Sequence, residues 1–365
     1  MNISERISSE LTRRDLRVNR AASGSLRALR GRLRELETTI IDLMKQADIT
    51  DPSRRIHRFN RLDKMMTDVA SAIRASYGAT SRDLAASMAQ LSQIEGAFTR
   101  SMVNSEAGAD IFRGVTSDRL KALADDTIIE GAPAADWWKR QEVGTRNRFH
   151  DEMRKGLLLD ESNSDLIRRV RGRRERQFQD GIMRTSTQSA ERIIRTSFAS
   201  VAQNSREAVY KANQDVIRGV QALATLDTRT SLICIARSGA SWNVQTGQPL
   251  PESPRQEPYP GAPPWHWRCR TQLITVLKSF EDIIGERGKG VDDALNADPG
   301  TQASMDGQVG ARLTFEQVAK GWGEKRLVES LGRGRYELWK DGKISFTDLI
   351  DQKGRPLLIA ELDAA

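Results

Sequence analysis

Cysteine and histidine are scarce in this chain: its 365 residues include two cysteines and three histidines. Two cysteines do not make a disulfide framework in a chain of this size. The sequence also lacks the apolar run of about 20 residues that a membrane-spanning helix needs. Its N-terminal segment, MNISERISSELTRRDLRVNR, contains no apolar signal-peptide core. These absences predict a soluble protein that is made and kept in a reducing cytosol, with no membrane partner.

Aromatic residues are also few, at 5%, whereas charged residues make up 29% of the chain and the mean hydropathy is −0.55. Lys and Arg number 57 against 49 Asp and Glu, which gives a formal net charge of +8. This excess of basic groups favours an anionic partner, with nucleic acid first and an acidic protein surface second. The alternative is that the charges only cover solvated helix surfaces.

The first hundred residues carry a narrow apolar stripe at three- and four-residue spacing, which is typical of one face of a helix. Its first part consists of Leu26, Leu29, Leu33, Leu36, Ile40 and Leu43. Helix breaks are predicted at 51–53 and at 78–81, where proline or glycine interrupts the pattern. We predict a helical hairpin or coiled-coil arm over 1–105 that docks on a partner or on a copy of itself. A three-helix bundle is the alternative.

The middle of the chain, 106–222, is predicted to be helical and basic. Six arginines fall within nine residues, at Arg168, Arg169, Arg171, Arg173, Arg174 and Arg176. This run is a candidate contact for the phosphates of double-stranded DNA, bound without sequence preference, or for an acidic protein surface. The alternative is the solvated face of a helix.

After residue 222 the sequence alternates apolar and polar residues and turns rich in proline. We predict a strand beginning at 224, a proline-rich loop over 249–264 and a second strand over 271–278. These form a small α+β module over 223–290, followed by a small helical unit over 291–365. The fold class is therefore mainly α: a long N-terminal helical arm, a helical middle region and a small α+β module near the C-terminus.

One histidine and both cysteines belong to this module. If its two strands pair, Cys234 approaches His266 and Cys269. Zinc in a structural site takes four nitrogen, sulfur or oxygen ligands, so Asp227, Glu252 or a water would have to complete the set. Three interpretations stay open: a knot without metal that tryptophans cover, a structural zinc site, and a catalytic site.

The segment TLDTRTSLIC, followed by a glycine turn, a proline-rich loop and PPWHWRCRTQLITV, resembles the signature of the phage Mu protein F-like family. That signature joins Asp-x-Arg-Thr-Ser and a nearby cysteine to Pro-Pro-x-His-x-x-Cys-Arg. The matching positions are Asp227, Arg229, Thr230, Ser231, Cys234, His266, Cys269 and Arg270. The phrase SLGRGRYELWKDGKISFTDLIDQKGRPLLIAEL also resembles the usual ending of the family, and the resemblance spans about residues 120–365.

The resemblance implies a phage head morphogenesis, or minor head, protein without enzymatic activity. Such a protein lies in the capsid interior of the virion, and in the host cytoplasm during assembly, with the portal, the major capsid or scaffold proteins and packaged DNA as partners. Many members carry a second cysteine three positions after the first, where this chain has Arg237. We therefore expect no cofactor, with zinc as the alternative. Two other functions stay open: a metal-dependent nuclease or hydrolase centred on His266, and an injected effector.

Overall fold

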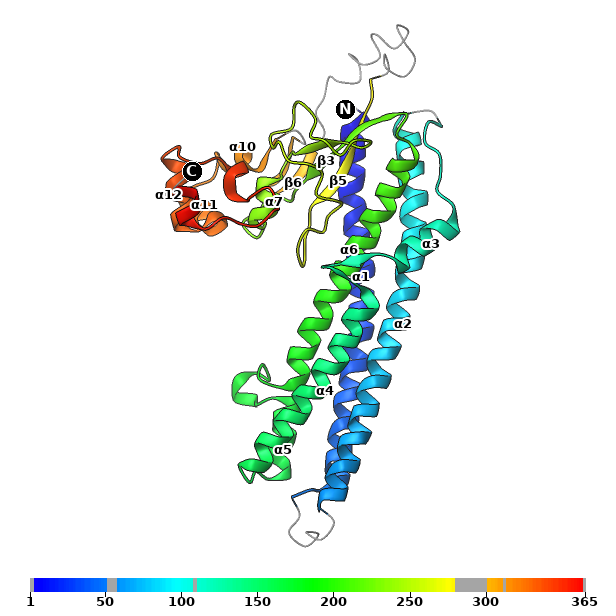
Figure 1. Ribbon diagram of the computed structural model, residues 1–365, viewed down its shortest axis with the longest axis vertical. Coiled ribbons are helices and arrows are strands. Elements are labelled where there is room, and N and C mark those ends of the chain that lie inside the picture. The colour runs from blue at the N-terminus through cyan, green and yellow to red at the C-terminus, as the bar shows by residue number, and fades with distance from the viewer. Residues whose placement is uncertain (1–2, 51–57, 108–109, 280–300, 311–312, 364–365) are drawn as a thin grey trace. The chain divides into compact units, whose positions relative to one another are not determined.

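The computed structural model describes residues 3–50, 58–107, 110–279, 301–310 and 313–363 (Figure 1). The protein is mainly α-helical, with a long N-terminal helical arm and small sheets in its C-terminal part, which confirms the predicted fold class. Residues group by their contacts into two compact units. The helical unit consists of Asn19–Ala89 and Asp125–Phe198, and the sheet unit of Met1–Val18, Gln90–Ala124 and Ala199–Ala365. This grouping follows packing and not chain order, so the four predicted segments stay a prediction.

The helical unit is built from long helices that run beside one another (Figure 1). It contains parts of α1 (Ile3–Ala47), α2 (Arg58–Ala107) and α6 (Ile182–Ala212), together with α4 (Ala134–Leu158), α5 (Asn163–Arg171), the short 3-10 helix η2 (Arg174–Arg176) and the two-residue strands β1 (Ile128–Ile129) and β2 (Ala132–Pro133). Five of the six residues of the predicted stripe on α1 are buried in it, with Leu29 and Ile40 each 1% exposed, whereas Leu43 is half-buried. On α2, the Tyr77 ring lies 6.2 Å from the Trp138 ring of α4. The α1 stripe and the Tyr77 face of α2 are thus covered within the same chain.

The predicted helix break at 78–81 is wrong, because α2 runs without interruption through these residues. Glycine weakens a helix by about 1 kcal/mol relative to alanine, a cost that tertiary packing readily overrides. Here Tyr77 is 1% exposed and its hydroxyl lies 3.0 Å from the Thr145 Oγ1 atom of α4. The Thr80 hydroxyl donates to the Ser76 carbonyl at 3.0 Å within the same helix. The other predicted break, at 51–53, lies outside the described residues.

A fragment of residues 1–107 is expected to be unstable or oligomeric when expressed alone. In the whole chain α4 contacts the Tyr77 face of α2, and Glu191 of α6 pairs with Arg30 of α1 at 2.6 Å. Without α4 and α6 the buried stripe would face water, and two helices with narrow stripes bury too little area to be stable alone. Circular dichroism melting and light scattering check this expectation. A compact, cooperatively melting monomer would contradict it.

The sheet unit contains a three-stranded antiparallel sheet in the order β4-β3-β5. Its strands are β3 (Ile217–Leu223), β4 (Ser241–Asn243) and β5 (Gln272–Leu277). The strand predicted to begin at 224 is wrong, because β3 already ends at Leu223. Beyond it, the Thr230 hydroxyl donates to the Thr225 carbonyl and folds the chain into a turn in place of a ladder. The last pair of the β3–β5 ladder is Leu223 with Gln272, so the two segments that follow and precede these residues lie together.

Helix ends cover one face of this sheet. The core there joins Trp242 and Leu273, both fully buried, to Ile7 of α1, Val103 of α2 and Tyr210 of α6. The short helix α3 (Ser117–Asp125) packs Leu120, which is 3% exposed, against Gly96 of α2. The sheet therefore packs on an apolar base formed by these helices.

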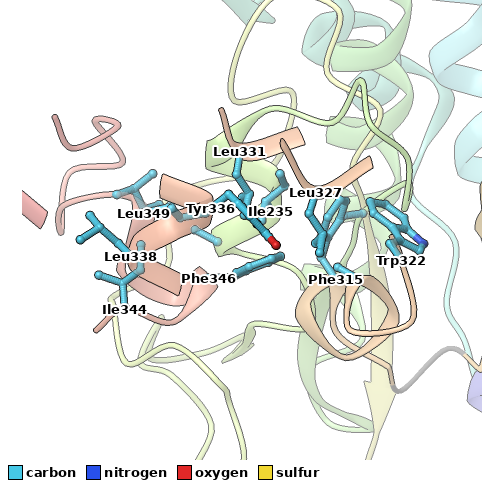
Figure 2. Close-up of a cluster of buried hydrophobic side chains, with 14 of the residues drawn as sticks. Ile235, Phe315, Trp322, Leu327, Leu331, Tyr336, Leu338, Ile344, Phe346 and Leu349 are labelled. Carbon is cyan, nitrogen blue, oxygen red and sulfur yellow. The ribbon is translucent and has the colours of Figure 1, made fainter. Parts of the chain in front are cut away.

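The C-terminal elements form a second core in the sheet unit. They are β6 (Thr301–Ser304), β7 (Gly307–Gly310), α10 (Phe315–Ala319), α11 (Glu324–Leu331), α12 (Arg333–Lys340), the 3-10 helix η4 (Phe346–Leu349) and α13 (Ile359–Asp363). Figure 2 shows Phe315, Leu331 and Phe346 gathered around Ile235, which belongs to α7 (Leu232–Ala236). One side of α7 is thereby fixed by this core. No helix among the described residues is apolar and long enough to cross a membrane.

Candidate functional site: a histidine–cysteine clasp

The site lies where the turn after β3 meets the turn before β5. Ser231 caps the N-terminus of α7 by accepting a hydrogen bond from the Cys234 backbone N–H at 3.4 Å. On the other segment the Cys269 N–H donates to the His266 carbonyl at 3.1 Å, which closes a tight turn. The β3–β5 ladder brings these two turns together. We call the set of Cys234, His266 and Cys269 the clasp.

The three side chains of the clasp touch one another. The two Sγ atoms are 3.5 Å apart, and His266 Nε2 lies 3.1 Å from Cys234 Sγ. Cys234 is 2% exposed and Cys269 is 8% exposed. Cys234 thus meets the Cys269 thiol, 35 residues later in the chain, and the His266 imidazole, 32 residues later.

The neighbours of the clasp fix its protons. His266 Nδ1 lies 2.9 Å from the Trp267 carbonyl, which can only accept, so Nδ1 carries a hydrogen. The Ser231 hydroxyl lies 2.7 Å from Nε2. A hydrogen bond from Cys234 lowers the pKa of the Cys269 thiol, against the opposing effect of burial and with help from His266. The same hydrogen bond, together with burial, raises the pKa of Cys234.

An ion pair joins the two segments that carry the clasp. Arg270 donates two parallel hydrogen bonds of 2.6 Å to the Asp227 carboxylate. Partial burial would raise the pKa of Asp227, but the Arg270 bonds and charge and the Arg229 backbone N–H outweigh it and lower the pKa to about 2. The Thr230 hydroxyl lies 3.2 Å from the same carboxylate. The Arg229 side chain is 82% exposed and contributes little to the pair.

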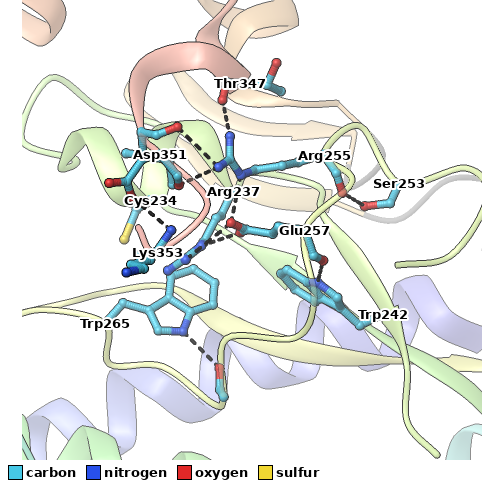
Figure 3. A network of polar contacts seen from close by, with 12 residues as sticks. Cys234, Arg237, Trp242, Ser253, Arg255, Glu257, Trp265, Thr347, Asp351 and Lys353 are labelled. Atoms are coloured by element: carbon cyan, nitrogen blue, oxygen red, sulfur yellow. Dashed lines mark hydrogen bonds and ion pairs between the residues drawn. The ribbon is translucent and has the colours of Figure 1, made fainter. Parts of the chain in front are cut away.

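A buried network anchors the proline-rich loop beside the clasp (Figure 3). Arg237, one residue past α7, pairs with Glu257 of the loop at 2.6 Å, and their side chains are 5% and 1% exposed. A second cation, Arg255, approaches the other Glu257 oxygen at 2.9 Å. Trp242 Nε1 donates to the Glu257 carbonyl at 2.9 Å, and the Arg237 guanidinium lies 4.8 Å from the centre of the Trp265 ring. The loop is therefore held by charge and by aromatic contacts together.

Sequence reasoning did not find this network. Glu257 is not among the predicted site residues, and Arg237 stands where many members of the Mu F-like family carry a second cysteine. Arg255 further donates to the Asp351 carbonyl at 2.7 Å and to the Ile350 carbonyl at 3.2 Å, which ties the loop to the C-terminal core. A glutamate among prolines gives no signal of its own. Its two cationic partners, Arg237 and Arg255, both precede it in the chain, and Arg255 also reaches carbonyls near the C-terminal end.

The donor chemistry of the clasp fits a metal ion. Its three ligand atoms all lie within 4.8 Å of one another, and two thiolates on tetrahedral zinc lie roughly 3.7 Å apart. The predicted carboxylate ligands are engaged elsewhere: Asp227 by Arg270, and Glu252 by Arg218 at 2.8 Å on the surface. An adjoining hollow of about 20 Å³ is large enough for one water. A fourth ligand would therefore be that water.

The arginine run of 168–176 belongs to the helical unit and does not present a uniform cationic surface. Arg169 is 18% exposed and joins Glu152 of α4, at 2.5 Å, to Glu161, at 2.7 Å. Its position between two carboxylates is structural. Four other members of the run also lie near carboxylates, with nitrogen–oxygen distances of 2.6–3.9 Å for Arg168, Arg171, Arg173 and Arg176. These four are exposed, as is Arg174, for which no ion pair is found among the described residues.

Comparison with known proteins gives no relative: no family model, curated protein or solved structure matches this chain.

Proposed function

We propose that the chain is a phage minor head protein, a structural component assembled inside the procapsid near the portal and the packaged DNA. One observation supports this most. The resemblance to the Mu F-like family rests on two segments, and their residues meet in one site. Asp227 of the first segment binds Arg270 of the second, and Cys234 contacts His266 and Cys269. A chance match between two separate motifs would give these side chains no reason to touch.

The geometry favours a structural role for the clasp over hydrolysis. A hydrolase needs a substrate-sized cavity and a general base free to take a proton. The hollow beside the clasp has a volume of about 20 Å³, which suits a water and not a phosphodiester or peptide. The Asp227 carboxylate is already bound by Arg270 through both oxygens. Nuclease activity that disappears in His266→Ala would contradict this part of the proposal.

Zinc is the ion that the clasp suits best. Thiolate and imidazole are its usual protein ligands, and a bound ion would stabilise the folded state directly. Cys234 and Cys269 would hold it through sulfur and His266 through Nε2. The Nδ1 hydrogen bond to the Trp267 carbonyl already orients the ring for that role. We expected a metal-free knot from the sequence; the convergence of three donors beside a water-sized hollow is the reason to propose zinc.

Weak, sequence-independent binding of duplex DNA is expected from the exposed arginines. Each lost phosphate contact should flatten the slope of log K against log salt by about 0.9. We expect this flattening when glutamine replaces Arg168, Arg171, Arg173, Arg174 and Arg176. Arg169→Gln is the contrasting variant, because it should lower the melting temperature of the helical unit. An unchanged slope in the five-residue variant would mean that these arginines form a solvated or protein-docking face.

The proposed location has its own test. In a phage whose genome encodes this chain, purified procapsids should contain it, and it should co-purify with the portal, the major capsid or the scaffold protein. Quantitative mass spectrometry of procapsid fractions measures its copies relative to the major capsid protein, and few copies are expected. A chain found only in the soluble host fraction, never with procapsids, would contradict the proposal.

A further inference from the structure

The helical unit contains a second hollow, of about 370 Å³, whose walls are rich in arginine. Arg30 and Arg34 reach it from α1, Arg171 from the end of α5 and Arg184 from the first turn of α6. All four residues are exposed. A volume in this range matches the roughly 300–1,000 Å³ of small-ligand pockets. Only one of the four, Arg171, belongs to the arginine run noted in the sequence.

Two of these arginines keep an uncompensated charge. Arg30 pairs with Glu191 at 2.6 Å, and Arg171 pairs with Glu37, another residue of the hollow, at 3.3 Å. In contrast, the Arg34 Nε donates to the Arg30 carbonyl at 3.2 Å. The Arg184 Nε likewise donates to the neutral Gln179 amide oxygen at 3.0 Å. Neither of these two guanidinium groups has an ion pair within the described part of the chain, so the hollow attracts anions.

Most of the remaining wall of the hollow is apolar, with Leu33, Phe178 and Met183 beside Thr187. Leu33 and Met183, 3% and 4% exposed, lie beneath it, whereas the Phe178 side chain is 44% exposed. Phe178 follows Gln177, and both have left-handed backbone angles, with φ of 58° and 52°. Such angles are strained for residues other than glycine and persist where the surrounding structure holds them. The Phe178 N–H donates to the Arg173 carbonyl at 2.9 Å. An exposed aromatic ring is thus held among cationic groups.

We propose that this hollow binds one nucleotide unit of a single-stranded nucleic acid, with the base against Phe178 and the flanking phosphates on Arg34 and Arg184. Bases stack on aromatic rings and guanidinium planes regardless of sequence, and phosphates pair with arginine. A duplex hides its bases in the stack, so it would leave the apolar wall unused. The hollow shares no residue with the clasp, and the proposal holds whether or not the chain is a head protein.

The exposed face of α1 offers a path for the strand beyond the hollow. Arg20, Arg27 and Arg34 are exposed and spaced seven residues apart, which places them along one side of the helix. At 1.5 Å per residue they lie about 10 Å from one another. Arg20 and Arg27 can therefore meet phosphates that follow the bound nucleotide.

The experiment uses the full chain and fluorescence anisotropy with labelled dT12, measured against an unlabelled 12-base-pair duplex and adenosine monophosphate as competitors. We expect dT12 to bind more tightly than the duplex. Phe178→Ala should weaken dT12 binding by roughly 5- to 100-fold, whereas Phe178→Tyr should retain it. The matched control is Phe59→Ala, which removes a phenylalanine that is 78% exposed on α2. It should leave dT12 binding unchanged.

The arginines are tested with a charge-matched pair of variants. Arg34→Gln with Arg184→Gln should lower the salt slope for dT12 by about 1.4, since each contact to a single strand contributes about 0.7. The exposed pair Arg82→Gln with Arg154→Gln loses the same charge outside the hollow and should change the slope less. If adenosine monophosphate competes with dT12, the hollow also binds the free nucleotide. If it does not compete, the hollow binds the nucleotide only as part of a strand. Duplex binding as tight as dT12 binding, with Phe178→Ala unchanged and normally folded, would overturn the proposal.

Discussion

Replacing Glu257 by alanine is expected to lower the free energy of unfolding by about 3–5 kcal/mol, because it leaves a buried charge without its partner. Arg237 and Arg255 both lie against this carboxylate, and their side chains are 5% and 8% exposed. The same loop carries the clasp residue His266 a few positions later. Chemical denaturation of the wild type and the variant measures the difference, and the loss should extend to the whole sheet unit.

The loop supplies its own control for this prediction. Glu252 forms an ion pair with Arg218 at 2.8 Å, but its side chain is 51% exposed and its partner 44%. Exposed pairs contribute about 0–1 kcal/mol, so Glu252→Ala should be close to neutral. A Glu257→Ala protein no less stable than Glu252→Ala would show that the buried network does not hold the loop.

Removing the clasp is the second large effect. We expect the purified protein to contain nearly one zinc per chain and to lose several kcal/mol of stability when a chelator extracts it. Cys269→Ala should remove both the zinc and the sensitivity to chelator. Loss of the side chain without any metal would cost only about 1–3 kcal/mol, as buried packing or hydrogen-bond losses do. Elemental analysis measures the zinc content, and melting curves with and without chelator show whether the loss of stability is the larger one expected with zinc or the smaller one expected without it.

Ser231→Ala is the companion variant for the clasp. It deletes the hydroxyl that lies 2.7 Å from His266 Nε2 but keeps all three donors, so zinc should remain bound. Protein without zinc, and with melting unchanged by chelator, would reject the metal and leave the clasp as a hydrogen-bonded knot. A double variant of His266→Ala and Cys269→Ala that is fully stable would reject the clasp altogether.

Periodicity in the sequence was enough to predict the helical arm. The leucines from Leu26 to Leu36 repeat at the spacing of one helix face, and the structure buries them there, with Leu33 3% exposed. Local propensity was a poorer guide. The glycine at position 78 suggested a break in α2, yet the neighbouring Tyr77 is packed against α4 and holds the helix through it. Tertiary contacts of this kind have no local signal.

The site could be predicted only in part, for a related reason. The motif residues suggested that Cys234, His266 and Cys269 would meet, and the structure places their ligand atoms within 4.8 Å. The partners of Arg237 and the arginine-lined hollow depend on residues far apart in the chain. Arg34 and Arg184 lie on different helices, and only the folded helical unit brings them to the same hollow. No spacing within one segment encodes such a pair.

The proposed place of this chain in a phage head is tested most directly by the protein content of purified virions before and after DNA ejection. Quantitative mass spectrometry should detect the chain in a few copies per intact particle. Retention in emptied heads would identify a fixed head component, and loss with the DNA would identify a head protein that leaves during ejection. Absence from intact virions and from the procapsids that precede them would contradict the account.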